Sequence, residues 1–123
     1  MIEQIKELPP NMVGFRTTGE VIKEDFETVT EVVKNLVDRI GKLNYLLIID
    51  NDLSDFTAGA WSQDALLGIK NLTKWNRAAI VSDYEGVKKF TDAFSVITPG
   101  EFKGFSKNKY EEAIIWTSKK TNN

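Results

Sequence analysis

The segment Asn44-Tyr45-Leu46-Leu47-Ile48-Ile49-Asp50 is a continuous apolar run that ends in an acidic residue. Such a run is typical of a central parallel strand that is covered on both faces of its sheet. Short polar side chains follow at its carboxyl end, namely Asp50, Asp52, Ser54, Asp55 and Thr57. Ligands bind at the carboxyl ends of strands in open α/β sheets, so this edge is the first place to expect a binding site.

Two strands and a helix are predicted before this run. Residues 2–8 have strand character and end at Pro9-Pro10-Asn11, which favours a turn. Residues 12–21 alternate between apolar and polar, which indicates an antiparallel pair with one covered face. The residues expected on that covered face are Val13, Phe15, Thr17 and Val21, with Arg16, Thr18 and Glu20 opposite. Apolar residues then recur at steps of three and four from Phe26 to Ile40, which predicts an amphipathic helix that Gly41 ends.

Three helices and two strands are predicted after the central run. Residues 58–72 have helical spacing, and residues 77–81 form a short apolar strand. Ser82-Asp83-Tyr84-Glu85 has the pattern of a capping box that opens a third helix, which continues through Phe94. Pro99-Gly100 precedes a last strand over residues 102–105, and residues 110–116 form a closing helix.

The element order is therefore β-β-α-β-α-β-α-β-α. Short connections and right-handed crossovers turn this order into an α/β fold with a mixed sheet. The first hairpin is expected to be antiparallel, the remaining strands mainly parallel, and the helices packed on the sheet. No linker or repeat interrupts residues 1–123, so a single domain is expected.

Composition excludes several functional classes. The 123 residues carry a net charge of −2, which disfavours nucleic-acid binding because that function needs a basic surface. The chain has neither cysteine nor histidine, so disulfides, thiolate metal sites and the usual neutral-pH general base are excluded. The amino terminus lacks a secretion signal and no apolar run is long enough to span a membrane, so a cytoplasmic protein is expected.

The region around Asp50 also invites two phosphotransfer hypotheses. Residues 46–54 resemble the opening motif of haloacid-dehalogenase phosphotransferases, but the only later candidate segment, residues 80–86, lacks that family's glycine-aspartate pair. Receiver domains need an acidic pair at the end of their first strand, where this chain has Leu8-Pro9-Pro10. We therefore expect a solvated acidic loop that binds no catalytic metal and no cofactor, and a protein that is not an enzyme.

A group of aromatic residues is concentrated in the second and third predicted helices and their flanks. The group consists of Phe56, Trp61, Trp75, Tyr84, Phe90 and Phe94. Aromatic residues at helical spacing usually pack in the core, and the alternative is an apolar ligand pocket or a membrane-facing lid. The lysine-rich segments 70–74 and 103–109 would flank such a face, although ordinary solvated surface is the simpler interpretation.

Residues 52–59, Asp-Leu-Ser-Asp-Phe-Thr-Ala-Gly, resemble the switch loop of SpoIIAA-type anti-anti-sigma factors. In those factors a serine just before the glycine accepts phosphate, and here Ala58 stands in that place, with Ser54 and Thr57 as neighbouring hydroxyls. Further segments resemble the SpoIIAA-like branch of the STAS superfamily. They include Arg77-Ala78-Ala79-Ile80-Val81-Ser82-Asp83, Pro99-Gly100-Glu101-Phe102 and Glu112-Ala113-Ile114-Ile115-Trp116.

This resemblance implies a small STAS domain, often dimeric, that is also similar to the lipid-carrying CRAL-TRIO fold. It implies no catalytic residues. The leading hypothesis is a binding domain for an apolar or lipid-like small molecule, with the aromatic group as its ligand-binding residues and contact with a membrane surface as an extension. The alternative is a protein-interaction regulator of the anti-anti-sigma type, whose partner loop consists of Asp55, Thr57, Ala58 and Gly59.

Overall fold

The strands that the structure describes form one sheet in chain order. This computed structural model describes residues 1–22, 24–50, 75–83 and 101–119. The strands are β1 (Ile2–Gln4), β2 (Val13–Thr17), β3 (Leu43–Ile49), β4 (Trp75–Val81) and β5 (Glu101–Phe105). β1 pairs with β2 antiparallel, and the other neighbouring pairs are parallel. The predicted mixed α/β sheet is confirmed.

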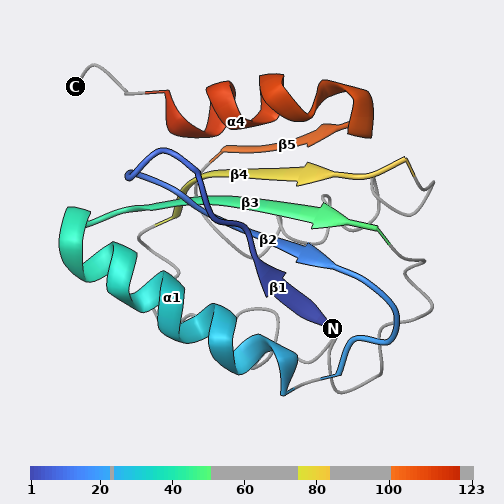
Figure 1. Cartoon of the computed structure of the whole chain (residues 1–123). Coiled ribbons are helices and arrows are strands. Elements are labelled where there is room, and N and C mark those ends of the chain that lie inside the picture. Colours follow the sequence, from blue (N-terminus) through green and yellow to red (C-terminus); the bar gives the residue numbers. More distant parts are fainter. Residues whose placement is uncertain (23, 51–74, 84–100, 120–123) are drawn as a thin grey trace.

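One described helix covers each face of the sheet (Figure 1). The longer helix, α1 (Asp25–Ile40), packs on one face, and α4 (Tyr110–Ser118) packs on the other after a 3-10 turn, η3 (Lys107–Lys109). All seven residues of β3 are buried. Tyr45 and Leu47 belong to the cluster under α1, whereas Leu46 and Ile48 belong to the cluster under α4. The continuous apolar run is therefore a central strand covered on both sides, as its sequence predicts.

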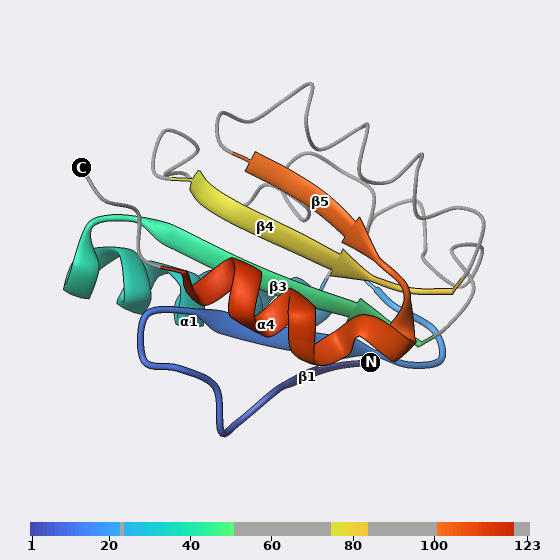
Figure 2. The same ribbon diagram turned by 90° about the horizontal axis from the view of Figure 1, so that it is seen from above.

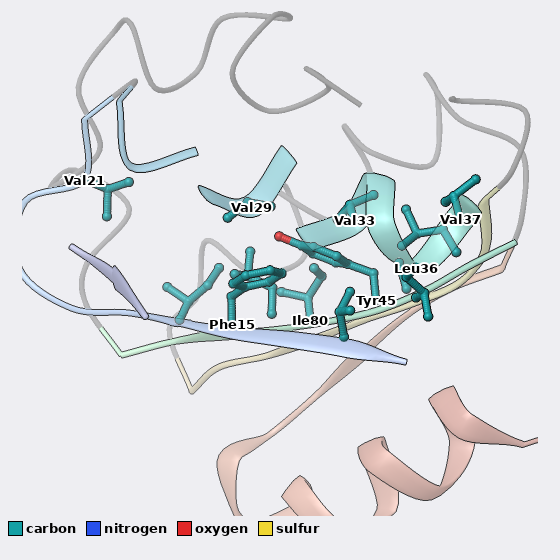
Figure 3. Close-up of a cluster of buried hydrophobic side chains, with 13 residues drawn as sticks. Phe15, Val21, Val29, Val33, Leu36, Val37, Tyr45 and Ile80 are labelled. Carbon is teal, nitrogen blue, oxygen red and sulfur yellow. The ribbon is translucent and has the colours of Figure 1, made fainter. Parts of the chain in front are cut away.

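The core under α1 combines aromatic residues of the sheet with an aliphatic stripe of the helix (Figure 3). Phe15 and Tyr45 lie side by side, with ring centroids 5.7 Å apart. The helix contributes Val29, Val33, Leu36 and Val37, all of them buried. Gly41 ends the helix in the left-handed conformation, with φ of 77°, and its N–H donates to the carbonyl of Val37. The predicted stripe and its glycine stop are both confirmed.

The core under α4 is smaller and uses the β1–β2 connection as additional cover. Leu46, Ile48, Val81 and Phe105 contribute from the sheet, and Ala113 contributes from the helix. Figure 2 shows α4 running back over the sheet from the end of β5. Ile5 and Leu8 pack against the same cluster. A Cβ atom at Gly14 would lie 2.6 Å from Cδ1 of Leu8, so the absence of a side chain there lets the connection lie close to β2.

A chain of polar contacts closes the amino-terminal edge of the parallel strands. The side-chain amide of Asn76 donates to Oδ1 of Asn44, and the amide of Asn44 donates to the carbonyl of Asn11. The amide of Asn11 in turn donates to the carbonyl of Ser118 at the end of α4. Arg77 donates to another carbonyl of this helix, that of Trp116, and its guanidinium lies 5.3 Å from the Trp116 ring centroid. These contacts satisfy backbone oxygens that a helix end leaves without partners.

Two predicted strand boundaries are wrong. The strand predicted over residues 2–8 ends at Gln4, because Glu7 adopts a left-handed conformation with φ of 64° and the following prolines cannot extend a ladder. The strand predicted over residues 12–21 covers only 13–17, since Gly19 turns the chain with φ of 57°. Val21 is nevertheless fully buried, as the alternation predicts. The helices predicted over 58–72 and 82–94 lie outside the described residues, apart from Ser82 and Asp83.

Candidate functional site at the carboxyl edge of the sheet

Strands β2 to β5 run in the same direction, so their carboxyl ends lie at one edge of the sheet (Figure 1). The register pairs Thr17 with Ile49 and Ile48 with Val81. The residues that follow each strand are therefore brought together, although they are far apart in the sequence. Asp50 follows β3 directly, and its backbone N–H donates to the carbonyl of Thr17, 3.0 Å away.

Asp50 is the centre of an ion-pair cluster that joins three elements. One carboxylate oxygen lies 3.0 Å from Nε of Arg16 on β2. The other lies 2.5 Å from Nζ of Lys107 in η3. The Asp50 side chain is 27% exposed and that of Lys107 is 35% exposed, so the cluster is partly screened by solvent. The Asp50 carboxylate therefore holds both cations near the end of β3.

Asp83 fixes the position of Lys107 through the main chain. Its Oδ1 accepts the backbone N–H of Lys107 at 2.9 Å, and the N–H of Ser82 donates to the carbonyl of Phe105. The turn after β5 is thus attached to the end of β4. Lys107 is therefore oriented by its backbone as well as by its ammonium group, which makes it a fixed part of this edge.

A hollow of about 220 Å³ lies beside the cluster. The described residues that line it are Arg16, Ile48, Asp50, Val81, Lys107 and Tyr110. Ile48 and Val81 are buried residues of the α4 face, and Arg16 is the register partner of Ile48. The hollow thus combines two aliphatic side chains, a phenol, two cations and one carboxylate. This combination is suited to a small molecule with an apolar part and an anionic part.

A second hollow, of about 460 Å³, lies at the opposite end of the molecule. It is lined by the β1–β2 connection and by α1, and it includes Lys6, Glu7 and Arg39. Arg39 already donates to the carbonyl of Pro10, which ties the helix to the connection. Although this hollow is larger, it lies at the amino-terminal edge, and its described lining holds no ion pair. We therefore place the candidate site at the carboxyl edge.

Most of the residues predicted as functional fall outside the part of the chain that the structure describes. This holds for Phe56, Trp61, Tyr84, Phe90 and Phe94, and for the loop residues Asp55, Thr57, Ala58 and Gly59. Trp75 is the first residue of β4, but the position of its side chain is not described. The ligand-binding and partner-loop assignments therefore stay predictions.

The described site contains residues that sequence reasoning missed. The sequence pattern places Arg16 only on the solvent-facing side of a strand, and it favours solvated surface as the interpretation of Lys107. That interpretation is wrong for Lys107, because its ammonium group pairs with Asp50. The sequence gives a positional signal for Asp50 alone, which ends a predicted strand, whereas Arg16 lies in the middle of the strand predicted over residues 12–21.

The described residues offer neither a metal-binding cluster nor a membrane-spanning helix. Across residues 1–22, 24–50, 75–83 and 101–119, no group of three or more acidic, histidine or cysteine side chains is placed to hold a metal ion. No helix within these ranges is long and apolar enough to cross a membrane.

Comparison with known proteins identifies relatives by sequence and by structure. The family model described as SpoIIAA-like matches residues 12–118. A solved structure that resembles this one is an uncharacterised protein of the DUF3478 family with a SpoIIAA-like fold, from Shewanella loihica PV-4. The two chains are 25% identical, with a TM-score of 0.66, and the match covers 94% of this chain and 93% of the other. No curated protein sequence matches this chain significantly.

Proposed function

The chain belongs to the SpoIIAA-like family, and we propose that it is a non-enzymatic binding domain for a small amphipathic molecule. The family and the fold are compatible with a regulatory domain without catalytic activity. Support for a small-molecule ligand comes from one observation above all. The hollow at the carboxyl edge places the half-buried Tyr110, above the buried Ile48 and Val81, next to Arg16 and Lys107, so that apolar and charged side chains meet in one place.

The composition of the site supports binding rather than catalysis. The chain contains no histidine or cysteine that could act as nucleophile or neutral-pH base. Asp50, the acidic residue in the described lining of the hollow, is engaged by two cations. Such a site holds a ligand without transforming it.

A titration with octanol tests this proposal, because octanol carries an apolar chain and no charge. Amide NMR spectra should show shifts at the ends of β2, β3 and β4, with residues 39–44 at the opposite edge as the internal control. A matched pair of variants sharpens the result. Val81→Thr introduces a polar atom beside the hollow and should weaken binding severalfold. Val37→Thr, on the buried face of α1, should leave binding unchanged. If octanol shifts no amide, or shifts both edges equally, the proposed function is wrong.

The second candidate function is a protein-interaction regulator of the anti-anti-sigma type that lacks the usual phosphoserine. The observation that favours it is the family match, together with the position of the loop Asp55 to Gly59 soon after Asp50. Affinity capture would compare the wild type with Asp55→Lys and with the control Lys103→Glu. A partner that is lost only with Asp55→Lys would support this function, and a lack of any partner that depends on Asp55 would contradict it.

A homodimer and contact with a membrane surface also stay proposals. Sedimentation of the purified chain would test the first. Co-sedimentation with phosphatidylcholine vesicles, with and without anionic lipid, would test the second.

A further inference from the structure

The carboxyl-edge hollow carries a specific charge pattern. Among the described residues its lining includes two cations, Arg16 and Lys107, and one carboxylate, Asp50, so the formal charge of these three side chains is 2 − 1 = +1. Asp83 lies beyond this lining, with its Oδ1 accepting the backbone N–H of Lys107. A hollow with excess positive charge and aliphatic walls favours a ligand that combines an anion with an apolar chain.

We propose that the polar end of the ligand is a carboxylate that binds Arg16 and Lys107 in competition with Asp50. This inference rests on the proposed function and names the chemical class of its ligand. Asp50 is then the displaceable counter-ion of the site. In the absence of ligand it pairs with both cations, and an incoming carboxylate takes over part of these contacts.

The geometry of Arg16 supports the assignment of a planar anion as its ligand. Its Nε is paired with Asp50, and within the described residues its other N–H groups have no protein partner. A guanidinium offers five N–H donors in a fork that matches the two oxygens of a carboxylate. The Arg16 side chain is 48% exposed, so these donors are accessible from solvent. An ammonium group in the same place would supply charge without this directional match.

The size of the hollow limits the ligand. Pockets for drug-sized molecules typically measure about 300–1,000 Å³, and this hollow is smaller, at about 220 Å³. It accommodates a head group and the first methylenes of a chain, with the half-buried Tyr110 as the main apolar contact and the buried Ile48 and Val81 beneath it. The net charge of +1 on Arg16, Lys107 and Asp50 also fits a monoanion better than a phosphate dianion.

The test compares octanoate with octanol, octyl phosphate and acetate by calorimetry on the full chain. Octanoate should bind at least about tenfold more tightly than octanol, because it adds the charged contacts. Acetate should bind too weakly to detect, since it lacks the chain. Increasing salt should weaken the binding of octanoate and leave that of octanol unchanged. Octyl phosphate that binds more tightly than octanoate would overturn the assignment of a carboxylate.

The variants are expected to change the affinity for octanoate in opposite directions, which distinguishes effects at the site from general effects on folding. Asp50→Asn removes the internal competitor and should raise the affinity for octanoate at least about fivefold. Arg16→Gln and Lys107→Gln should each lower it about tenfold, and Arg16→Lys should give an intermediate loss. Lys103→Gln is the matched control, because Lys103 is exposed on β5 and does not line the hollow. Partial unfolding would weaken binding in every variant and cannot produce the gain with Asp50→Asn.

The outcomes distinguish the two proposals. If octanol and octanoate bind equally and Asp50→Asn changes neither, the site binds apolar chains and the carboxylate inference is wrong. If Asp50→Asn weakens octanoate binding, Asp50 is not a competitor and the inference is also wrong. If neither molecule binds, both the inference and the proposed function are overturned.

Discussion

Asn44→Asp should destabilise the fold in a manner that depends on pH. Asn44 is 1% exposed; its Oδ1 accepts from Asn76 at 2.7 Å, and its Nδ2 donates to the carbonyl of Asn11 at 2.8 Å. The substitution keeps the shape and the acceptor but replaces the donor with a second oxygen. When ionised, that oxygen faces the Asn11 carbonyl, so a hydrogen bond becomes a repulsive contact next to a buried charge.

The magnitude follows from this geometry. Breaking a buried polar pair so that a charge remains without compensation costs about 3–5 kcal/mol, which is a large part of the roughly 5–15 kcal/mol that stabilises a domain. The protonated carboxyl can donate to the Asn11 carbonyl as the amide does, so its cost should be about 1 kcal/mol or less. Burial therefore raises the pKa of the introduced carboxyl above its unfolded value of about 3.9.

The sign of the pH dependence is fixed by this shift. The folded state of the variant binds more protons than its unfolded state, so stability falls as pH rises above about 4, by at most about 1.4 kcal/mol per unit. The loss levels off above the folded pKa. Urea unfolding followed by tryptophan fluorescence, for variant and wild type at each pH, isolates this contribution. Asn44→Leu removes both hydrogen bonds without adding charge and should show a loss that is independent of pH. A constant difference between Asn44→Asp and the wild type from about pH 5 to about pH 8 would refute the reasoning.

Three further predictions concern the core and the end of α1. Burial raises the pKa of the Tyr45 phenol above its usual value of about 10, so the stability that depends on its neutral form is present below about pH 10 and is lost as pH rises further. Tyr45→Phe should therefore reduce the dependence of the unfolding free energy on pH in the alkaline range, and an unchanged dependence would contradict this. Phe15→Ala should lower the unfolding free energy by about 3–5 kcal/mol in urea, because Phe15 is fully buried, whereas Ile115→Ala, at a side chain that is 68% exposed, should change it by less than about 0.5 kcal/mol. Gly41→Ala should cost about 1–2 kcal/mol by thermal unfolding, since φ is 77° and no atom lies near the added methyl; a loss below about 0.3 kcal/mol would show that the helix can end without the left-handed residue.

Structural features that depend on residues close together in the sequence could be predicted. The run around Leu46 and Ile48 predicts a strand buried on both faces, and Gly41 predicts the end of a helix; the structure has both. The overlong first strand has a physical cause as well. Ile5 and Leu8 are apolar because they cover the cluster under α4, and strand patterns cannot distinguish that use from pairing in a sheet.

Contacts between distant segments were not predictable in this way. Arg16, Asp50 and Lys107 come together only through the register of parallel strands and the turn after β5. A lysine-rich segment such as 103–109 has no periodicity that marks one lysine as paired. Asn44 likewise appeared only as the first residue of a strand, whereas the structure shows it joining Asn76 to Asn11. Polar residues reveal their partners through three-dimensional position, and a single sequence does not contain that information.

The polar contacts at the two ends of β3 differ in kind, and this difference separates stability from binding. At the amino-terminal edge Asn44 is buried and neutral, with its amide oxygen and nitrogen both paired to protein atoms. At the carboxyl edge the contacts are ionic and partly exposed, and Arg16 retains donors without protein partners among the described residues. Asn44 and Asp50 are six residues apart along one strand, or about 20 Å, which exceeds the distance over which substitutions usually couple. The effects of Asn44→Leu on stability and of Asp50→Asn on octanoate affinity should therefore add in the double variant. A loss of the affinity gain in that variant would mean that the amino-terminal edge controls the site through the sheet.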